Sequence, residues 1–148
     1  VEQRKRETTK NQMVTSSLLE AEKRLLGLIS QSKKLYKMSS AQIKAEEFAT
    51  NVYRRLAKSM YDSYENGMSP DPAMMLNDFS GDDLSEASEV FYNLEVYSGD
   101  EETVKELLYT IKLEKLNMRI NAEADPTNLM DLFKQREELL NEKNTWEE

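Results

Sequence analysis

The chain has 148 residues, 39% of them hydrophobic and 32% charged, which is the size of one domain able to bury a core. It contains no Cys and no His, so a zinc finger, a thiol nucleophile, a histidine acid–base pair and a disulfide framework are excluded. The formal net charge of -8 is uneven, because residues 67–103 hold no Lys or Arg. This acidic middle disfavours a nucleic-acid surface there, and it is either a solvated face or a patch for a basic partner.

No run of about 18 apolar residues occurs, so we expect no membrane-spanning segment and no membrane partner. Val1–Ser17 also lacks the apolar stretch of a signal peptide. Together with the absence of Cys, these features predict a cytoplasmic protein. The chain begins with Val, which suggests a fragment of a longer protein.

The first half of the chain predicts a linker and three helices. Residues 1–15 show no hydrophobic period and are expected to be a flexible linker. Apolar residues then recur at helical spacing from Leu18 to Ile29. A short helix is predicted over Lys33–Ile43 and a strong one over Glu46–Glu65, where a broad apolar face is typical of a central helix.

Turn chemistry divides the second half. Asn66-Gly67 should end the central helix, and Asp71 and Pro72 should cap and start the next one. A fifth short helix is expected around Leu84–Leu94. No segment alternates with period two, so no sheet is predicted.

The longest predicted helix, from Asp100 to about Ala124, has an apolar stripe that changes side along its length. Its first half should therefore contact the globular part and its second half something else. After Asp125-Pro126-Thr127, a last helix is predicted from about Asn128 to Trp146. The sequence thus predicts an all-α fold: a globule of about six helices (16–112) followed by an antiparallel helical hairpin (113–148).

The sequence lacks the common catalytic and ligand-binding motifs, including a Gly-rich phosphate loop, G-x-S-x-G and D-x-D-x-D-G. We therefore expect no catalytic, cofactor-binding or metal-binding residues and no small-molecule substrate. The hairpin is the candidate partner-binding region, since helix docking needs apolar anchors at helical spacing with a charged rim. The candidates, shared between hairpin seam and partner contact, are Leu116, Arg119, Ile120, Leu129, Leu132, Phe133, Arg136, Leu140 and Trp146.

Several segments resemble a known family. Leu19–Ile29 (LEAEKRLLGLI) resembles the opening helix of the helicase-binding domain of bacterial DnaG-type primases, and a related helix opens the N-terminal domain of their DnaB-type helicase partner. The stretch from Phe48 through Tyr53–Leu56 to Pro70-Asp71-Pro72 resembles both families. Because the chain continues into a hairpin and contains no P-loop, the primase domain is favoured.

This resemblance implies a non-catalytic domain whose parent chain would be a DNA primase. The hairpin would bind the N-terminal collar of the replicative DnaB-type helicase hexamer, recruit primase to the fork and modulate the helicase, with no direct nucleic-acid binding expected. The alternatives are the N-terminal domain of the helicase itself, a helicase loader, an unrelated helical adaptor, and a small enzyme using only carboxylates and lysines.

Overall fold

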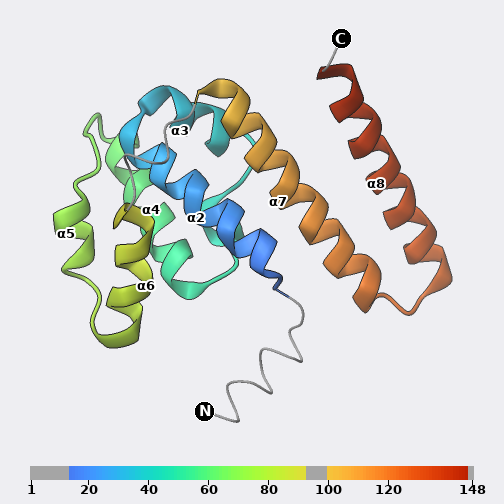
Figure 1. Cartoon of the computed structure of the whole chain (residues 1–148), viewed down its shortest axis with the longest axis horizontal. Helices are drawn as coiled ribbons and strands as arrows, with labels where there is room; N and C mark the ends of the chain where they lie inside the picture. The colour runs from blue at the N-terminus through green and yellow to red at the C-terminus, as the bar shows by residue number, and fades with distance from the viewer. Residues whose placement is uncertain (1–13, 93–99, 147–148) are drawn as a thin grey trace. The chain divides into compact units, whose positions relative to one another are not determined.

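The computed structural model describes residues 14–92 and 100–146, with the side chain of Trp146 left out. These residues form only helices, with no strand among them, which confirms the predicted all-α fold. The elements are α2 (Ser16–Gln31), α3 (Lys33–Ser40), the 3-10 helix η1 (Ala45–Glu47), α4 (Asn51–Glu65), α5 (Pro72–Leu76), α6 (Gly81–Tyr92), α7 (Glu101–Ala122) and α8 (Pro126–Trp146) (Figure 1).

The described residues divide into two compact units. One comprises residues 20–108, and the other comprises residues 14–19 together with 109–146. The divisions fall inside α2 and α7, so both helices contribute residues to both units. Residues 1–13, for which a linker is predicted, and 93–99 lie outside the described residues.

Helix α4 is the centre of the unit formed by residues 20–108. It contacts η1, α3 and α6, and one side of it is buried along its whole length. Leu56, Ala57 and Met60 are fully buried. This arrangement follows from the broad apolar face that the sequence predicts, which is wide enough to contact several neighbouring elements.

Buried polar groups tie the neighbouring segments to this core. Tyr64 Oη donates to the Ile29 carbonyl at 2.6 Å, and Tyr61 Oη donates to the Ile43 carbonyl at 2.9 Å. Glu22 is fully buried, and its Oε1 accepts the Ala49 N–H at 2.8 Å. The two tyrosine bonds satisfy buried carbonyl groups, each of which would otherwise cost roughly 1–3 kcal/mol.

The start of the central helix differs from the prediction of one helix over Glu46–Glu65. The 3-10 helix η1 occupies residues 45–47, and α4 begins only at Asn51. Thr50 is the N-cap, since its Oγ1 accepts the Tyr53 N–H at 3.0 Å. Phe48, 1% exposed, is buried in the link between η1 and α4. Capping and burial of an aromatic ring therefore outweigh the helical period of the sequence at this point.

The turn into α5 is as predicted. Asp71 is the N-cap, its Oδ1 accepting the Ala73 N–H at 3.1 Å, and Pro72 is the first helical residue. Gly67 and Gly81 have positive φ angles of 74° and 58°, which glycine adopts without a Cβ penalty. Helix α6 ends at Tyr92, and Leu94, included in the prediction, lies outside the described residues.

Candidate interaction surface on the helical hairpin

Asp125 and Pro126 make the link between α7 and α8. Asp125 Oδ1 accepts the Thr127 N–H at 2.9 Å, which caps α8, and Pro126 is the first residue of the helix. Glu123 Oε1 accepts the Asp125 N–H at 3.0 Å. The prediction treated Pro126 as part of the break and is two residues late, because proline at the first helical position loses no intrahelical bond.

Two contacts show that α7 and α8 are antiparallel. Arg136 Nη1 donates to Asn117 Oδ1 at 2.9 Å, and the Lys143 amine lies 4.3 Å from the centre of the Tyr109 ring. Moving about two turns towards the C-terminus on α8 therefore moves the contact about two turns towards the N-terminus on α7. Figure 1 shows the two helices joined by a short loop.

The apolar residues of α7 change side, as the sequence indicated. Successive helical residues are about 100° apart, so the stripe that includes Val104 and Ile111 lies almost opposite the stripe that includes Leu113 and Ile120. Every residue from 112 to 118 is half-buried. This part of α7 has neighbours on two sides, because Thr15 Oγ1 donates to Glu114 Oε2 at 3.0 Å while Asn117 contacts α8.

The seam of α8 follows a heptad pattern. The residues at this spacing are Leu129, Leu132, Arg136, Leu139 and Lys143, and two of them make the contacts with α7 described above. Leu132 is 4% exposed and is the only residue of α8 in the buried core of the described chain. The hairpin is therefore held by one buried leucine, half-buried leucines on either side, and two cationic side chains.

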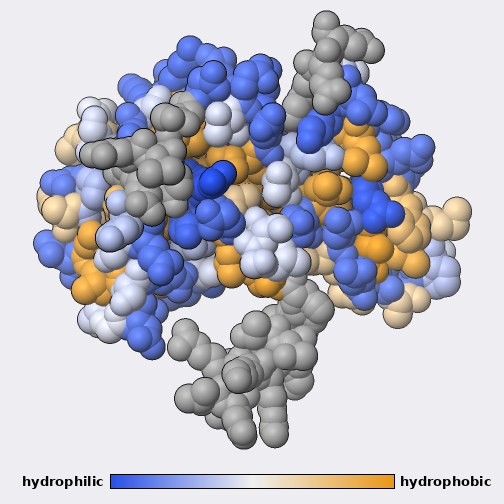
Figure 2. All heavy atoms as spheres, in the orientation of Figure 1, coloured by the Kyte–Doolittle hydropathy of each residue, from blue (hydrophilic) through white to orange (hydrophobic). Residues whose placement is uncertain are grey.

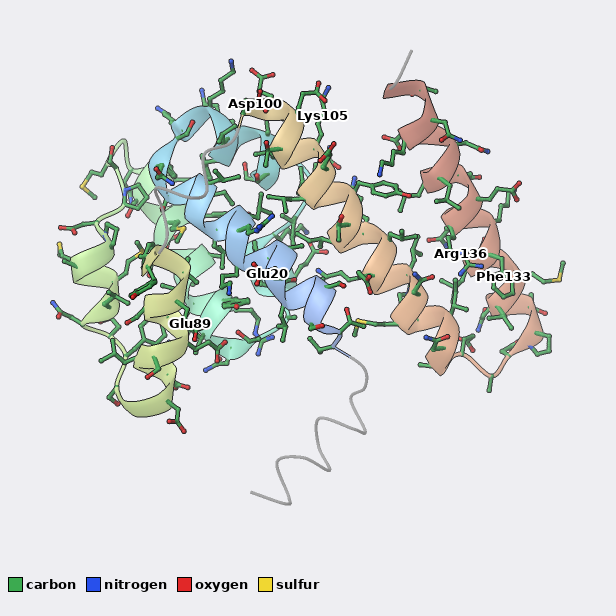
Figure 3. The ribbon with its side chains drawn as sticks, viewed as in Figure 1. Glu20, Glu89, Asp100, Lys105, Phe133 and Arg136 are labelled. Carbon is green, nitrogen blue, oxygen red and sulfur yellow. The ribbon has the colours of Figure 1, made fainter. Side chains whose placement is uncertain are left out.

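A second set of apolar residues on α8 lies beside the seam and faces water. We call Met130, Phe133 and Leu140 the outer stripe; they are 73%, 41% and 41% exposed. Their spacing of three and seven residues places them on one side of the helix. The guanidinium carbon of Arg136 lies 5.2 Å from the centre of the Phe133 ring, and Figure 3 shows these two side chains as neighbours on α8. Figure 2 shows apolar residues reaching the surface along this helix.

A charged groove of about 400 Å³ lies on the opposite side of the seam. Helix α7 contributes Lys112, Lys115 and Arg119 to one wall, whereas α8 contributes Gln135, Glu138 and Glu142 to the other. Leu116 and Leu139 also line it. The hairpin thus presents an apolar surface on one side and a groove with walls of opposite charge on the other.

The structure places the predicted partner-binding residues in three environments. Leu132 is buried in the seam. Leu116, Ile120, Leu129 and Arg136 are half-buried, and Arg119, Phe133 and Leu140 are exposed. Trp146 is the last residue of α8, and its side chain lies outside the description. Partner contact by these residues stays a prediction. The sequence reasoning omitted Met130 from the hairpin candidates, although its spacing to Phe133 and Leu140 pointed to it.

Comparison with protein families identifies the class of the chain. Residues 14–115 match the model of the DnaB-like helicase N terminal domain. This range covers more than half of the chain, so the chain belongs to the DnaB-like helicase N-terminal domain family. The domain is helical and non-catalytic. No curated protein and no solved structure matches the chain.

The prediction of a primase helicase-binding domain is wrong, because the matching family is the helicase domain. The predicted primase parent chain and primosome role are wrong for the same reason. The residues that carry the resemblance, from Leu19 to Pro72, all lie inside the matched range. The preference for primase rested on the hairpin and the missing P-loop. All of the predicted hairpin except residues 113–115 lies outside the matched range, and the lack of a P-loop is equally compatible with a helicase N-terminal domain.

Within the part of the chain that the structure describes, no helix is long and apolar enough to cross a membrane. Over the same residues, no group of three or more carboxylates is arranged to hold a metal ion.

Proposed function

We propose that this chain is the N-terminal domain of a bacterial replicative helicase and that its hairpin joins it to a second copy of the domain. The observation that carries the proposal is the outer stripe on α8, where three large apolar side chains face water beside the seam. A cytoplasmic location and the absence of catalysis in this domain accompany this function.

Exposed apolar side chains aligned along one helix are typical of a surface that another helix covers. The family match identifies a DnaB-like helicase N-terminal domain. The resemblance described above implies that the DnaB-type helicase is a hexamer, which makes a second copy the candidate partner. A second copy would present the same stripe, so a two-fold axis between two α8 helices would bury Met130, Phe133 and Leu140 of each copy. In this proposal residues 16–112 form the globular subdomain and residues 113–148 form the contact, with residues 1–15 as a linker.

Sedimentation velocity over a wide range of concentration tests the proposal. We expect the unmodified chain to form dimers or larger assemblies and the variant Phe133→Glu/Leu140→Glu to sediment as a monomer. The matched control is Met68→Glu/Met74→Glu, which places two carboxylates at methionines that are 59% and 68% exposed in the other unit. This control should assemble like the unmodified chain.

A chain that stays monomeric at all concentrations would contradict self-association. Loss of assembly in both variants would show a general effect of added charge rather than a contact at the outer stripe. A monomer that binds a cognate primase or helicase loader, and loses that binding only in Phe133→Glu/Leu140→Glu, would replace the second copy by that partner.

A further inference from the structure

We propose that a cleft between α3, η1 and α4 binds the phosphate backbone of single-stranded nucleic acid. The sequence alone favoured no nucleic-acid contact, and the proposal is independent of the hairpin contact. It rests on residues of the unit formed by 20–108.

The cleft has a volume of about 520 Å³ and lies wholly within that unit. Tyr36 from α3, Lys44 from the residue before η1, and Arg54, Arg55 and Lys58 from α4 line it. Four cationic side chains therefore meet around one opening, although they come from segments that are up to 14 residues apart in the sequence.

The charge of this region is opposite to that of the chain. Residues 33–58 contain seven Lys or Arg and two Asp or Glu, whereas residues 67–92 contain six Asp or Glu and no Lys or Arg. Lys33 and Lys37 of α3 are exposed and are spaced by one helical turn, so the basic surface continues beyond the cleft. An extended polyanion fits this layout better than a single small anion does.

Packing holds the two guanidinium groups in place. Arg54 Nη1 donates to the Phe48 and Ala49 carbonyls at 3.0 and 3.2 Å. Arg55 Nη2 donates to the Asp78 carbonyl at 2.9 Å, and its guanidinium carbon lies 4.3 Å from the centre of the Phe79 ring. Each group has five N–H donors, so several remain for phosphate oxygens without rearrangement of the side chain.

Tyr36 is a second, independent indication of a ligand. Its side chain is 9% exposed, with the ring centre 4.6 Å from that of Tyr64 and 5.2 Å from that of Tyr61. Its hydroxyl has no hydrogen-bond partner among the described residues, whereas those of Tyr61 and Tyr64 donate to carbonyls. Because Tyr36 lines the cleft, its O–H is available to donate to a phosphate oxygen.

An acidic peptide is the main alternative ligand, and the cleft fits it less well. Peptide recognition needs apolar pockets for anchor side chains, but the two aromatic residues lining this cleft, Tyr36 and Tyr61, are buried. The remaining large side chains that line it are charged. Phosphate neutralisation draws its affinity from the four cations among them.

The cleft also has carboxylates, and their position sets the path of the strand. Asp62 and Glu65 line it from the C-terminal half of α4, and Glu46 lines it from η1. Asp62 Oδ2 lies 3.4 Å from the Lys58 amine in an exposed ion pair that contributes little. Phosphates should therefore follow Lys44, Arg54 and Lys58 and avoid Glu65.

Fluorescence anisotropy with a labelled oligothymidylate of about 20 nucleotides tests the proposal. Three neutralised phosphates give a log–log salt slope of about -2, so raising salt from about 50 to about 200 mM should weaken binding about twentyfold. Lys44→Gln/Lys58→Gln should reduce the slope to about -0.7, since two of three contacts are lost. Glu65→Gln should tighten binding.

Two controls keep the result specific. Lys105→Gln/Lys134→Gln removes the same charge from exposed positions outside the cleft and should leave the slope unchanged. A variant with Arg4, Lys5, Arg6 and Lys10 changed to Gln should also retain binding. The proposal is overturned if binding vanishes in this last variant but survives in Lys44→Gln/Lys58→Gln. It is equally overturned if the oligonucleotide does not bind, or if inorganic phosphate or polyglutamate at equal charge displaces it as well as unlabelled oligothymidylate does.

Discussion

At the scale of single residues, three tyrosines connect the core of the unit formed by 20–108. Tyr36 stacks on Tyr64 and meets Tyr61 edge to face, so apolar contact and carbonyl hydrogen bonds occur in one cluster. The cluster joins α3 and α4 to the end of α2, where Tyr64 contacts the Ile29 carbonyl.

Removing one hydroxyl from this cluster should be costly. Tyr64→Phe leaves the buried Ile29 carbonyl without the 2.6 Å bond, so we expect the free energy of unfolding in urea to fall by about 1–2 kcal/mol. Tyr92→Phe is the control, because Tyr92 is 82% exposed and the change should be near zero. Equal effects of the two substitutions would contradict a buried role for the Tyr64 hydroxyl.

The same burial predicts loss of stability in alkali. Burial raises the pKa of Tyr53 and Tyr61 well above the usual value near 10, with nearby Glu86 and Tyr36 respectively adding to the rise. Above about pH 10 these tyrosines lose their protons in the unfolded chain but keep them in the folded chain. The unfolded state then binds fewer protons than the folded state. The free energy of unfolding should therefore be unaffected by these groups below about pH 9 and fall above about pH 10, by up to roughly 1.4 kcal/mol per pH unit for each tyrosine.

Urea unfolding at a series of alkaline pH values measures this fall. Lysines also lose protons in this range, so the informative comparison is with Tyr53→Phe, which should show a shallower decline than the unmodified chain. Identical slopes would mean that the Tyr53 phenol ionises equally in both states.

At the scale of elements, the hairpin depends on few buried groups, which predicts local opening. Leu132→Ala should destabilise the packing of α8 on α7 by about 2 kcal/mol. This is the low end of the usual cost of a buried Leu→Ala substitution, because the hairpin seam buries few side chains. Amide hydrogen exchange should then be about thirtyfold faster in α8, with α4 unchanged. Leu84→Ala removes an equal side chain from a position that is 37% exposed in the other unit and should leave exchange in α8 unaltered. Faster exchange in α4 as well would show that the two units unfold together.

The elements also show where sequence reasoning reaches its limit. A helix cap made by residues close in the sequence can be predicted. At Asp71 and Pro72 the capping hydrogen bond joins residues only two positions apart. The break before Asn51 could not be predicted in this way. It depends on the burial of Phe48 and on the hydrogen bond from the Ala49 N–H to Glu22, which lies 27 residues away in the sequence. A helical period continues through such a break, and nothing local to the sequence marks the distant partner.

At the scale of the whole molecule, the buried residues are unevenly distributed. Among the residues that the structure describes, every buried apolar residue except Leu132 lies between Leu18 and Ile111. Deleting residues 125–148 should therefore leave a cooperatively unfolding, helical chain that no longer self-associates. Circular dichroism during heating and sedimentation would measure the two effects. Loss of cooperative unfolding would mean that α8 is needed for folding, and assembly that persists would contradict the outer stripe as the contact.

Helix period, caps and proline positions act between residues a few positions apart. The amino-acid sequence was therefore enough to predict the helical class, several helix boundaries, the change of stripe along α7 and the hairpin. The folded structure was needed to show which hairpin residues are buried in the seam and which form the outer stripe. The folded chain alone places Tyr36 of α3, Lys44 and three cations of α4 around one cleft. Burial and surface charge depend on residues far apart in the chain, and the spacing of neighbours does not report on them.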